Sequence, residues 1–437
     1  MSAEGIVTVD DVEEYQSRIK DIDKQMAELF EERMRNCKRI AMYDKSHGLS
    51  IEDNMSRSKI QCAFDFKYEW LEDNSHLSYE QRHAANSIMN CHTSECGFNH
   101  MLCTECGYED IHYNSCRNRN CPNCQAILKE VWIDARRSEV IDGSYFHCVF
   151  TVPQELNQLI YSNQKLLYGL MHKCSAKTIL ELSADKKYLG ATPGIIQVLH
   201  TWGQKLNYHP HIHCIISGSG ITPDYRLITR GDSFFIPIRV MGRMFRGKFL
   251  DALQELYDNN ELVFCGEAES LRNTYSWNEF RDSLYKKDWC PYIKETFNRY
   301  GNAIEYLGRY ANRIAITNSR ISSVTQNHVT FSAKEYRTGK TSNVTLATEE
   351  FLRRLLMHVL PSGFQKIRYY GFLNNRSKKK NLAIIFRIQG HQAFKSKYTD
   401  MSIKEIMKEA WGYDVCMCPQ CKSTNIICIG HRYPMRC

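Results

Sequence analysis

A histidine-rich run offers ligands for a metal ion. His209, His211 and His213 occupy alternate positions in the apolar run HPHIHCIIS at 209–217. Side chains two residues apart on a β-strand lie on the same face of the sheet. Two neutral imidazoles from one strand can therefore reach a single cation.

A second apolar run supplies the expected third ligand. GIIQVLH at 194–200 precedes the histidine run across a short polar loop, which predicts an antiparallel hairpin. In such a hairpin His200 lies beside His211 and His213, and Gln204 and His209 are weaker candidates.

Two tyrosines offer hydroxyl groups for nucleophilic chemistry. Tyr306 and Tyr310 are four residues apart in a helical pattern at 300–312, so they share one face of the expected helix. A phenol can form a covalent intermediate with a substrate when a neighbouring group activates it. Pairs of histidines or tyrosines are also common in ordinary packing, so neither motif is decisive by itself.

Paired cysteines predict a zinc site. Cys103-x2-Cys106 and Cys121-x2-Cys124 are separated by 14 residues, a spacing typical of a four-cysteine zinc ribbon. Each CxxC turn brings two sulfurs to one side of a tight loop, and two such loops complete a tetrahedron. A site of this kind is structural, because four thiolates leave no open position on the ion.

Further cysteines leave two alternatives open, ordinary packing or additional zinc sites. Near the first set lie Cys91, Cys96, His100 and Cys116. Near the C-terminus, Cys418-x2-Cys421 predicts half of a second zinc knuckle. Its partners are ambiguous among Cys416, Cys428, His431 and Cys437.

Composition limits the classes of protein that fit. The chain has 437 residues, which is long enough for more than one core, and 24% charged with 43% hydrophobic residues indicates a globular protein. A net charge of +8 permits an anionic partner without requiring one. No apolar run reaches the length of a membrane span. The acidic start is unlike a secretory signal, and paired cysteines favour a reducing cytoplasm.

Several elements must position these groups. We expect helices at 77–90, 154–184 and 239–258, and strands at 145–153 and 234–238. Residues 11–44 carry an apolar stripe at helical spacing, which predicts one long amphipathic helix that needs a partner surface.

The first fifty residues or so resemble the first helix of the helical chorismate mutases. Arg33 and Asp53 fit that family, but Gln16 replaces an arginine and Asp44 replaces a catalytic lysine. These departures, and the lack of the following helices, argue against mutase activity. We expect instead an interaction element, which offers a route to a homodimer.

From about residue 58 the chain resembles the rolling-circle HUH transposases of the IS91 group of bacterial insertion sequences. Five blocks in the family's order carry the resemblance: YNSCRNRNCPNCQ (113–125), VLHTWGQ (198–204), HPHIHCIISGSG (209–220), YLGRYANRIAITN (306–318) and IRYYGFLNNR (367–376). Asn312 departs from the histidine that relatives often carry.

The resemblance implies an α+β fold, with an antiparallel HUH endonuclease sheet backed by helices. The expected regions are the long helix at 1–57, a zinc-binding domain at 58–130, the nuclease domain at 131–325, and a basic C-terminal region with a cysteine cluster at 326–437.

The resemblance also implies the chemistry. Mg2+ or Mn2+ at His200, His211 and His213 polarises a phosphate of single-stranded DNA, which Tyr306 or Tyr310 attacks to give a 5′-phosphotyrosine. The DNA substrates are then the ends of an insertion sequence and its target, in a bacterial cytoplasm and at the nucleoid. The structural metal is Zn2+.

Basic side chains are candidates for phosphate contacts. Arg309, Arg313 and Arg320 flank the tyrosines, and a second run comprises Arg376, Lys378, Lys379 and Lys380. The alternative for this second run is a solvated loop. Rival functions are a plasmid replication initiator or relaxase, and a non-catalytic zinc protein that binds DNA.

Overall fold

The computed structural model forms two units, Met1–Arg57 and Ser58–Cys437. It describes residues 57–230, 236–289, 291–294, 308, 315–335, 339–390, 395–412 and 414–433. The expected N-terminal helix, with its likeness to chorismate mutases, lies outside these residues. The boundary expected after residue 57 coincides with the division between the units.

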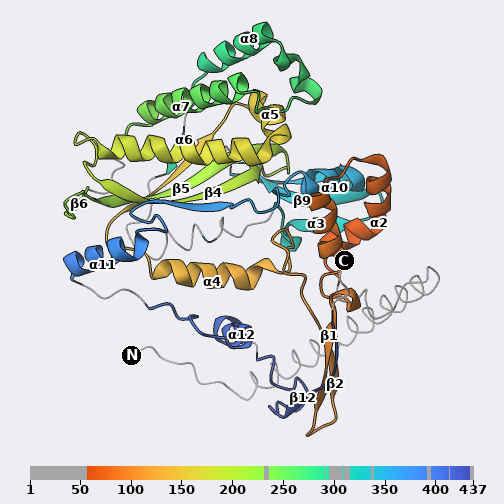
Figure 1. Ribbon diagram of the computed structural model, residues 1–437. Helices are drawn as coiled ribbons and strands as arrows, with labels where there is room; N and C mark the ends of the chain where they lie inside the picture. The colour runs from red at the N-terminus through yellow and green to blue at the C-terminus, as the bar shows by residue number, and fades with distance from the viewer. Residues whose placement is uncertain are drawn as a thin grey trace, which may run out of the picture. The chain divides into compact units, whose positions relative to one another are not determined.

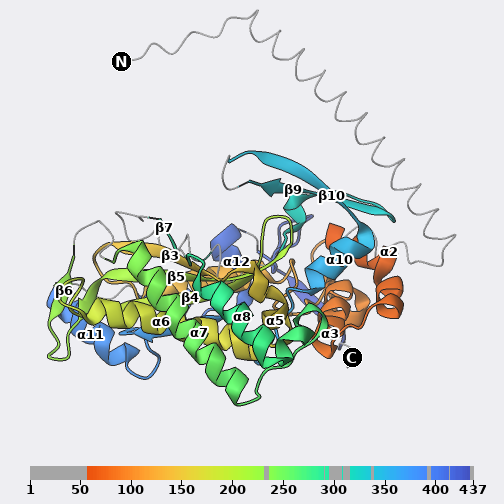
Figure 2. The same cartoon turned by 90° about the horizontal axis from the view of Figure 1, so that it is seen from above.

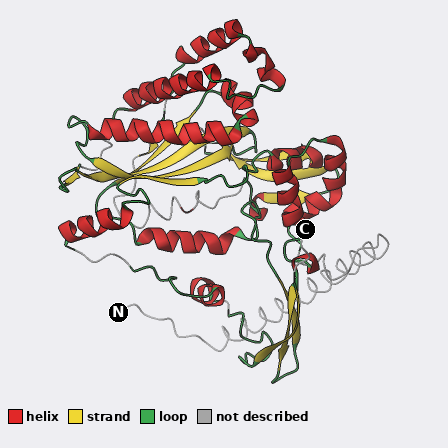
Figure 3. Ribbon diagram, viewed as in Figure 1, coloured by secondary structure: helices red, strands yellow, loops and turns green. Residues whose placement is uncertain are grey.

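One antiparallel sheet forms the centre of the larger unit (Figures 1 and 3). Its strands lie in the order β11-β4-β5-β3-β7, and β6 pairs with β5. Their bounds are β3 (Tyr145–Thr151), β4 (Thr192–Trp202), β5 (Tyr208–Ile221), β6 (Leu227–Thr229), β7 (Tyr292–Lys294) and β11 (Ile367–Gly371). The hairpin expected from the two apolar runs is therefore confirmed as β4 and β5.

Helices cover both faces of this sheet (Figure 1). α6 (Gln164–Ala184) and α7 (Ile238–Asp258) cover one face, and α4 (Gln125–Arg137) and α11 (Lys378–Gln389) cover the other. Both faces are apolar, so the central strands are buried almost throughout and do not show a simple alternation of polar and apolar residues.

The two faces divide the residues of β5 between them. Ile212, Cys214 and Ile216 pack in the core under α6 and α7, whereas Ile215 packs in the core under α4 and α11. Because successive side chains point to opposite faces, His211 and His213 lie on the α4 side.

A second core lies beside the central sheet. It joins α2 (Lys59–Asn74), α3 (Tyr79–Met89) and α10 (Thr348–Leu356) to a sheet of order β10-β9-β8. The strands are β8 (Ile321–Val324), β9 (His328–Lys334) and β10 (Thr341–Ala347), and Figure 2 shows β9 and β10 as a long pair. Capping boxes at Ser58 and Ser78 fix the starts of α2 and α3.

A third sheet brings the C-terminal region to the cysteine-rich segment. β12 (Ile426–Arg432) pairs with β1 (Phe98–Cys103), which pairs with β2 (Glu109–Tyr113). α12 (Ile403–Trp411) precedes β12. The remaining elements are short or peripheral: α5 (Asn157–Ser162), α8 (Thr274–Tyr285), η1 (Ser94–Cys96), η2 (Gln154–Leu156), η3 (Gly266–Arg272) and η4 (Asn318–Arg320).

Some expected boundaries differ from the structure. The helix expected at 154–184 is divided, because Asn163 leaves helical geometry between α5 and α6. The strand expected at 234–238 does not extend over Ile236, Pro237 and Ile238, where Pro237 instead precedes α7. Strands β11 and β12 pair with β4 and β1, so the boundary expected at 325 does not separate folding units.

Among the helices of the described residues, none combines the length and the apolar character that crossing a membrane requires.

The end of β11 depends on a glycine. Gly371 has φ +63°, and a Cβ there would lie 1.7 Å from the carbonyl oxygen of Pro193. Gly363 has a similar φ of +69°, but a Cβ there would meet nothing within 4 Å. A substitution at Gly363 therefore introduces backbone strain alone, whereas a substitution at Gly371 introduces backbone strain and steric overlap.

We predict that Gly363→Ala lowers the free energy of unfolding by roughly 1–2 kcal/mol, the cost of a left-handed non-glycine residue. Gly371→Ala loses about 1–3 kcal/mol more, because the added methyl group overpacks the strand. Denaturant unfolding of both variants measures the difference. Equal losses would contradict this account of Gly371.

Candidate functional site

Three histidines meet on the face of the sheet that α4 covers. The register of the hairpin places His200 directly opposite His211, and one ring nitrogen from each of His200, His211 and His213 lies within 4.8 Å of the others. The Nε2 atoms of His211 and His213 are 3.1 Å apart. The structure therefore assembles the three histidines that were expected to share a cation.

Hydrogen bonds orient two of these rings. Nδ1 of His211 lies 2.7 Å from the carbonyl oxygen of His209, which can only accept, so Nδ1 carries the proton and Nε2 keeps its lone pair. His209 thus contributes its carbonyl group, and its ring is not part of the group of three.

A fourth histidine, which sequence reasoning missed, orients His213. Nε2 of His147 lies 2.9 Å from Nδ1 of His213, and the two rings are stacked. His147 is 2% exposed and stands on β3, the other neighbour of β5. In the register of β3 with β5, Val149 lies opposite His213, and His147 lies on the same face two residues earlier. The sequence alone does not give this pairing, so it could not identify His147.

Burial keeps His211 in the protonation state that binds metals. Desolvation, with a smaller contribution from the neighbouring His209, lowers the pKa of His211 to about 3. The imidazole is therefore neutral at physiological pH, which is the form of histidine that ligates a cation.

The tyrosine pair lies outside the described residues, as do Arg309 and Arg313. Gly308, between the two tyrosines, is described and helical. A Cβ on Gly308 would lie 2.3 Å from Cγ1 of Ile133, so its backbone packs directly on α4. α4 covers the face of the sheet that carries the histidines.

The first group of four cysteines comprises Cys91, Cys116, Cys121 and Cys124. Cys91 Sγ lies 3.4 Å from Cys124 Sγ, and Cys116 Sγ lies 3.6 Å from it. Four sulfurs about 2.3 Å from a zinc ion are separated by roughly 3.8 Å, so this group fits zinc.

The second group comprises Cys103, Cys106, Cys418 and Cys421. It bridges the β1–β2 region and the C-terminal region, with sulfur separations of 3.5 Å between Cys103 and Cys421 and 3.6 Å between Cys106 and Cys418. Backbone hydrogen bonds around Cys421 lower the pKa of Cys418 to about 7, which favours the thiolate that a metal needs.

The expected pairing of Cys103 and Cys106 with Cys121 and Cys124 was therefore wrong. Each CxxC pair does join a four-sulfur group, but the two pairs belong to different groups. The sheet explains the exchange, because β12 pairs with β1 and brings Cys418 and Cys421 to Cys103.

The other metal-ligand candidates lie apart from both groups within the described residues. His100 pairs with Glu109 instead of a cysteine. Cys416 and Cys428 are exposed, and Cys437 lies outside the described residues.

The first cysteine group is connected to the elements around the histidines. Cys124 immediately precedes α4, the helix that contacts Gly308. Next to it, Asn123 accepts a hydrogen bond of 3.1 Å from Asn318, which follows the tyrosine segment. A zinc ion in this group would thus fix the start of α4 and the chain beyond the tyrosines.

The structure gives several of the expected basic residues internal partners. Arg320 donates to the carbonyl oxygens of Ser332 and Gln204. Lys378 forms an ion pair with Glu139 at 2.5 Å, and Lys380 donates to Tyr225. Lys378, Lys379 and Lys380 form the first turn of α11, and Arg376 lies in the turn before it; Arg376 and Lys379 are exposed.

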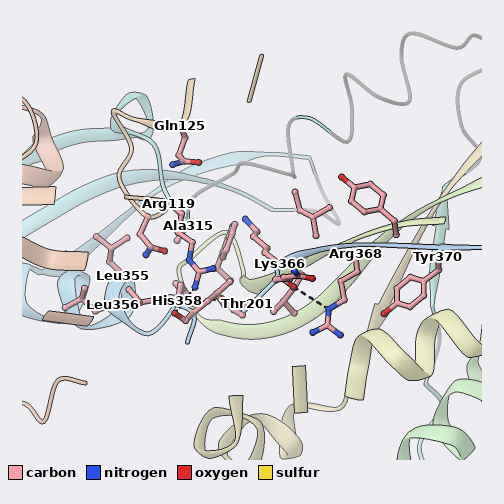
Figure 4. Close-up of a pocket in the computed structure, with 18 of the residues that line it drawn as sticks. Arg119, Gln125, Thr201, Ala315, Leu355, Leu356, His358, Lys366, Arg368 and Tyr370 are labelled. Atoms are coloured by element: carbon pink, nitrogen blue, oxygen red, sulfur yellow. Dashed lines mark hydrogen bonds between the residues drawn. The ribbon is translucent and has the colours of Figure 1, made fainter. Parts of the chain in front are cut away.

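A cavity of about 670 Å³ lies near the histidines. Figure 4 shows Arg119 and His358 towards one end and Tyr370 at the other, with Lys366 and Arg368 between them. Trp202 also lines it and stacks on His200, with ring centroids 4.5 Å apart.

The two groups predict two zinc ions in each chain. Cys103→Ser and Cys418→Ser should each remove the same ion and leave about one zinc per chain, because both ligands serve one four-thiolate site. Elemental analysis of the purified protein measures this. Cys265→Ser, an exposed cysteine outside both groups, is the control.

If Cys103→Ser and Cys121→Ser instead removed the same single ion, the assignment to two groups would be wrong.

Two family models match the chain. The family described as "Putative transposase" matches residues 194–381, which include the three histidines. The family described as "Transposase zinc-binding domain" matches residues 63–152, which include the first cysteine group.

Relatives cover most of the chain. A "Putative transposase y4qJ" of Sinorhizobium fredii (strain NBRC 101917 / NGR234) is 37% identical over 369 residues, covering 83% of this chain and 93% of the relative. The "Transposase for insertion sequence element IS801" of Pseudomonas savastanoi pv. phaseolicola is 27% identical over 294 residues, covering 66% of this chain and 69% of the relative.

Among solved structures, the "Conjugative Relaxase TRWC in complex with ORIT dna" is 12% identical with a TM-score of 0.23, covering 57% of this chain and 92% of that chain. The identity and coverage of the sequence relatives decide the family. The chain belongs to the transposases of the IS91 group, as its five sequence blocks predicted.

Proposed function

We propose that this transposase nicks and rejoins single-stranded DNA at the ends of an insertion sequence through a 5′-phosphotyrosine, by the rolling-circle route. The observation that carries the proposal is the group of three histidine ring nitrogens on β4 and β5. Membership of a transposase family supplies DNA as the substrate.

The histidine group suits a divalent cation. Three imidazoles leave coordination positions for oxygen ligands, and nitrogen ligands favour Mn2+ over Mg2+, which prefers oxygen. When bound, the cation polarises a non-bridging oxygen of the scissile phosphate. The protein's part is to hold one ring nitrogen of each of the three histidines on the same face of the sheet.

The nucleophile is Tyr306 or Tyr310. The phenolic oxygen attacks phosphorus and loses its proton, and the bond from phosphorus to the 3′ oxygen breaks. The departing oxygen takes up a proton to become a free 3′-hydroxyl. Support comes from Gly308, which stands between Tyr306 and Tyr310 in the sequence and packs against Ile133 on α4, the helix over the histidine face.

Rejoining reverses this step. A 3′-hydroxyl attacks the phosphotyrosine and releases the phenol, so the energy of the original bond is conserved without a nucleotide cofactor. Two tyrosines allow one to hold the first DNA end while the other cleaves the second. The DNA substrate places this activity at the nucleoid of a bacterial cytoplasm, and the segment 1–57 is a candidate for pairing two copies.

Basic residues near the tyrosines complete the proposal. Arg309 and Arg313 flank the nucleophiles in sequence, and the exposed Arg376 and Lys379 can reach backbone phosphates. Arg320, Lys378 and Lys380 have internal partners, so any contact they make with DNA competes with those bonds.

A non-catalytic zinc protein that binds DNA remains the rival from another class. A nicking enzyme of plasmids shares the chemistry, but the sequence relatives of this chain are transposases.

We predict a covalent protein–DNA band when the protein is incubated with Mn2+ and a labelled single strand carrying the element's terminus. Denaturing gels should show that His211→Ala abolishes the band, because the phosphate is no longer polarised. The double variant Tyr306→Phe with Tyr310→Phe should abolish it as well.

Tyr275→Phe, an exposed tyrosine on α8, should leave the band unchanged. Absence of any band on verified cognate ends, with zinc content and folding intact, would favour the non-catalytic rival.

His147 should act as a positioning residue for His213. We predict that His147→Ala weakens Mn2+ binding by about 10–100-fold, the usual effect of removing the partner of a histidine ligand. Titration of Mn2+ by electron paramagnetic resonance measures this without DNA. His147→Asn, whose amide can replace the hydrogen bond, should recover part of the affinity.

Unchanged Mn2+ affinity in His147→Ala, in a protein that still folds, would show that His213 needs no such partner.

A further inference from the structure

The cavity beside the histidines is built from six separate segments. They are the end of α3, the loop between β2 and α4 with the first residue of α4, the end of β4, the chain at Ala315, the end of α10 with the residues that follow it, and β11 with the loops on either side of it. Ala315 stands five residues after Tyr310 in the sequence. The cavity therefore lies where the cysteine-rich segment, the end of the strand that carries His200 and the chain at Ala315 converge.

The wall of the cavity is basic. Its described lining includes Arg119, Lys366, Arg368 and Arg376, and contains no aspartate or glutamate. Lys366 is half-buried and Arg376 is exposed. A concave surface with cations and without carboxylates concentrates anions, and the effect is strongest where low-dielectric walls exclude water.

Trp202 connects this wall to the metal-binding histidines. Its ring stacks on His200 at an angle of 19° between the planes, and Lys366 Nζ lies 5.0 Å from the centre of the Trp202 ring. Thr201, the residue between them, is hydrogen-bonded to His358 at 3.2 Å. A phosphate bound by Lys366 would thus lie close to the histidine centre.

The first cysteine group shapes the opposite wall. Arg119, between Cys116 and Cys121, donates hydrogen bonds to the carbonyl oxygens of Leu360, Pro361 and Phe364. Its role is to hold the loop after α10 against the cysteine-rich segment. Arg368 donates a hydrogen bond of 3.5 Å to the carbonyl oxygen of Gln365, and its guanidinium lies 5.2 Å from the centre of the Phe364 ring. The phosphate-binding candidates are Lys366, which lies beside Trp202, and Arg376, which is exposed.

The remaining lining suits a nucleobase. Asn120, Gln125, Asn374 and Asn375 offer amides that can donate and accept, and Leu199, Leu355 and Val359 offer apolar surface. A volume of about 670 Å³ falls in the range of small-ligand pockets, roughly 300–1,000 Å³. Such a cavity can enclose unpaired nucleotides and is too small for a duplex.

We propose that this cavity binds an unpaired nucleotide of the strand that is cleaved, adjacent to the scissile phosphate, with Lys366 and Arg376 on its backbone. The inference rests on the proposed function for the identity of the strand. It adds a subsite that selects single-stranded over duplex DNA and links the cysteine-rich segment to substrate binding.

The test is fluorescence anisotropy with a short labelled single strand of mixed sequence, without added Mg2+ or Mn2+ so that no cleavage occurs. Lys366→Ala with Arg376→Ala should weaken binding tenfold or more. The slope of log affinity against log salt should fall by roughly 1.4, because two phosphate contacts on a single strand are lost. Lys173→Ala with Lys177→Ala, at two exposed lysines on α6, is the control matched for the loss of two charges.

A second variant guards against misfolding. Arg376→Ala alone removes an exposed side chain and should still weaken binding of the single strand several-fold, while leaving the affinity for the same sequence as a duplex unchanged. Competition by a deoxynucleoside monophosphate distinguishes a pocket for free nucleotides from a subsite for the strand. Displacement of the strand by the monophosphate at comparable concentration would overturn the proposal.

The proposal would also be overturned if the cavity variants bound the single strand with the same affinity as the lysine control on α6. That failure is distinct from failure of the proposed function. If only the cavity proposal fails, wild-type protein and the cavity variants form the covalent band equally well on cognate ends. If the proposed function fails, wild-type protein forms no covalent band, whatever its affinity for the strand.

Discussion

The antiparallel pairing of β4 with β5 is the constraint on which the site depends. It sets His200 opposite His211, and a shift of one residue would turn His211 and His213 towards α6. The register is held from both sides, by β11 on β4 and by β3 on β5, and β3 also brings His147 to His213. Such a shift would be costly because both faces of the sheet are buried, and it would move the histidines into the apolar core under α6 and α7.

The cysteine groups act around this sheet in different ways. The first group immediately precedes α4, the helix against which Gly308 packs. Arg119 lies between two of its cysteines and forms part of one wall of the cavity. The second connects strands from opposite ends of the larger unit, since Cys103 and Cys418 are more than three hundred residues apart. Zinc in this second group would replace the apolar core that a small, exposed three-stranded sheet lacks.

Much of this arrangement was predictable from the sequence. Period-two histidines gave the shared face, the paired runs gave the hairpin, and together they gave His200 as the third member. The cysteine pairing was not predictable, because CxxC spacing identifies half-sites and only the pairing of β12 with β1 decides which halves meet. His147 was also missed, since a lone histidine in an apolar strand has no signal until its neighbour is known. The cavity could not be predicted either, because six segments that are separate in the sequence line it.

We propose that Tyr306 or Tyr310 becomes joined to DNA. Mass spectrometry of the protease-digested covalent complex tests it most directly, by locating the nucleotide on a peptide. The account predicts a 5′-phosphate ester on Tyr306 or Tyr310. An adduct on a serine, on a cysteine or on a tyrosine elsewhere in the chain would contradict it.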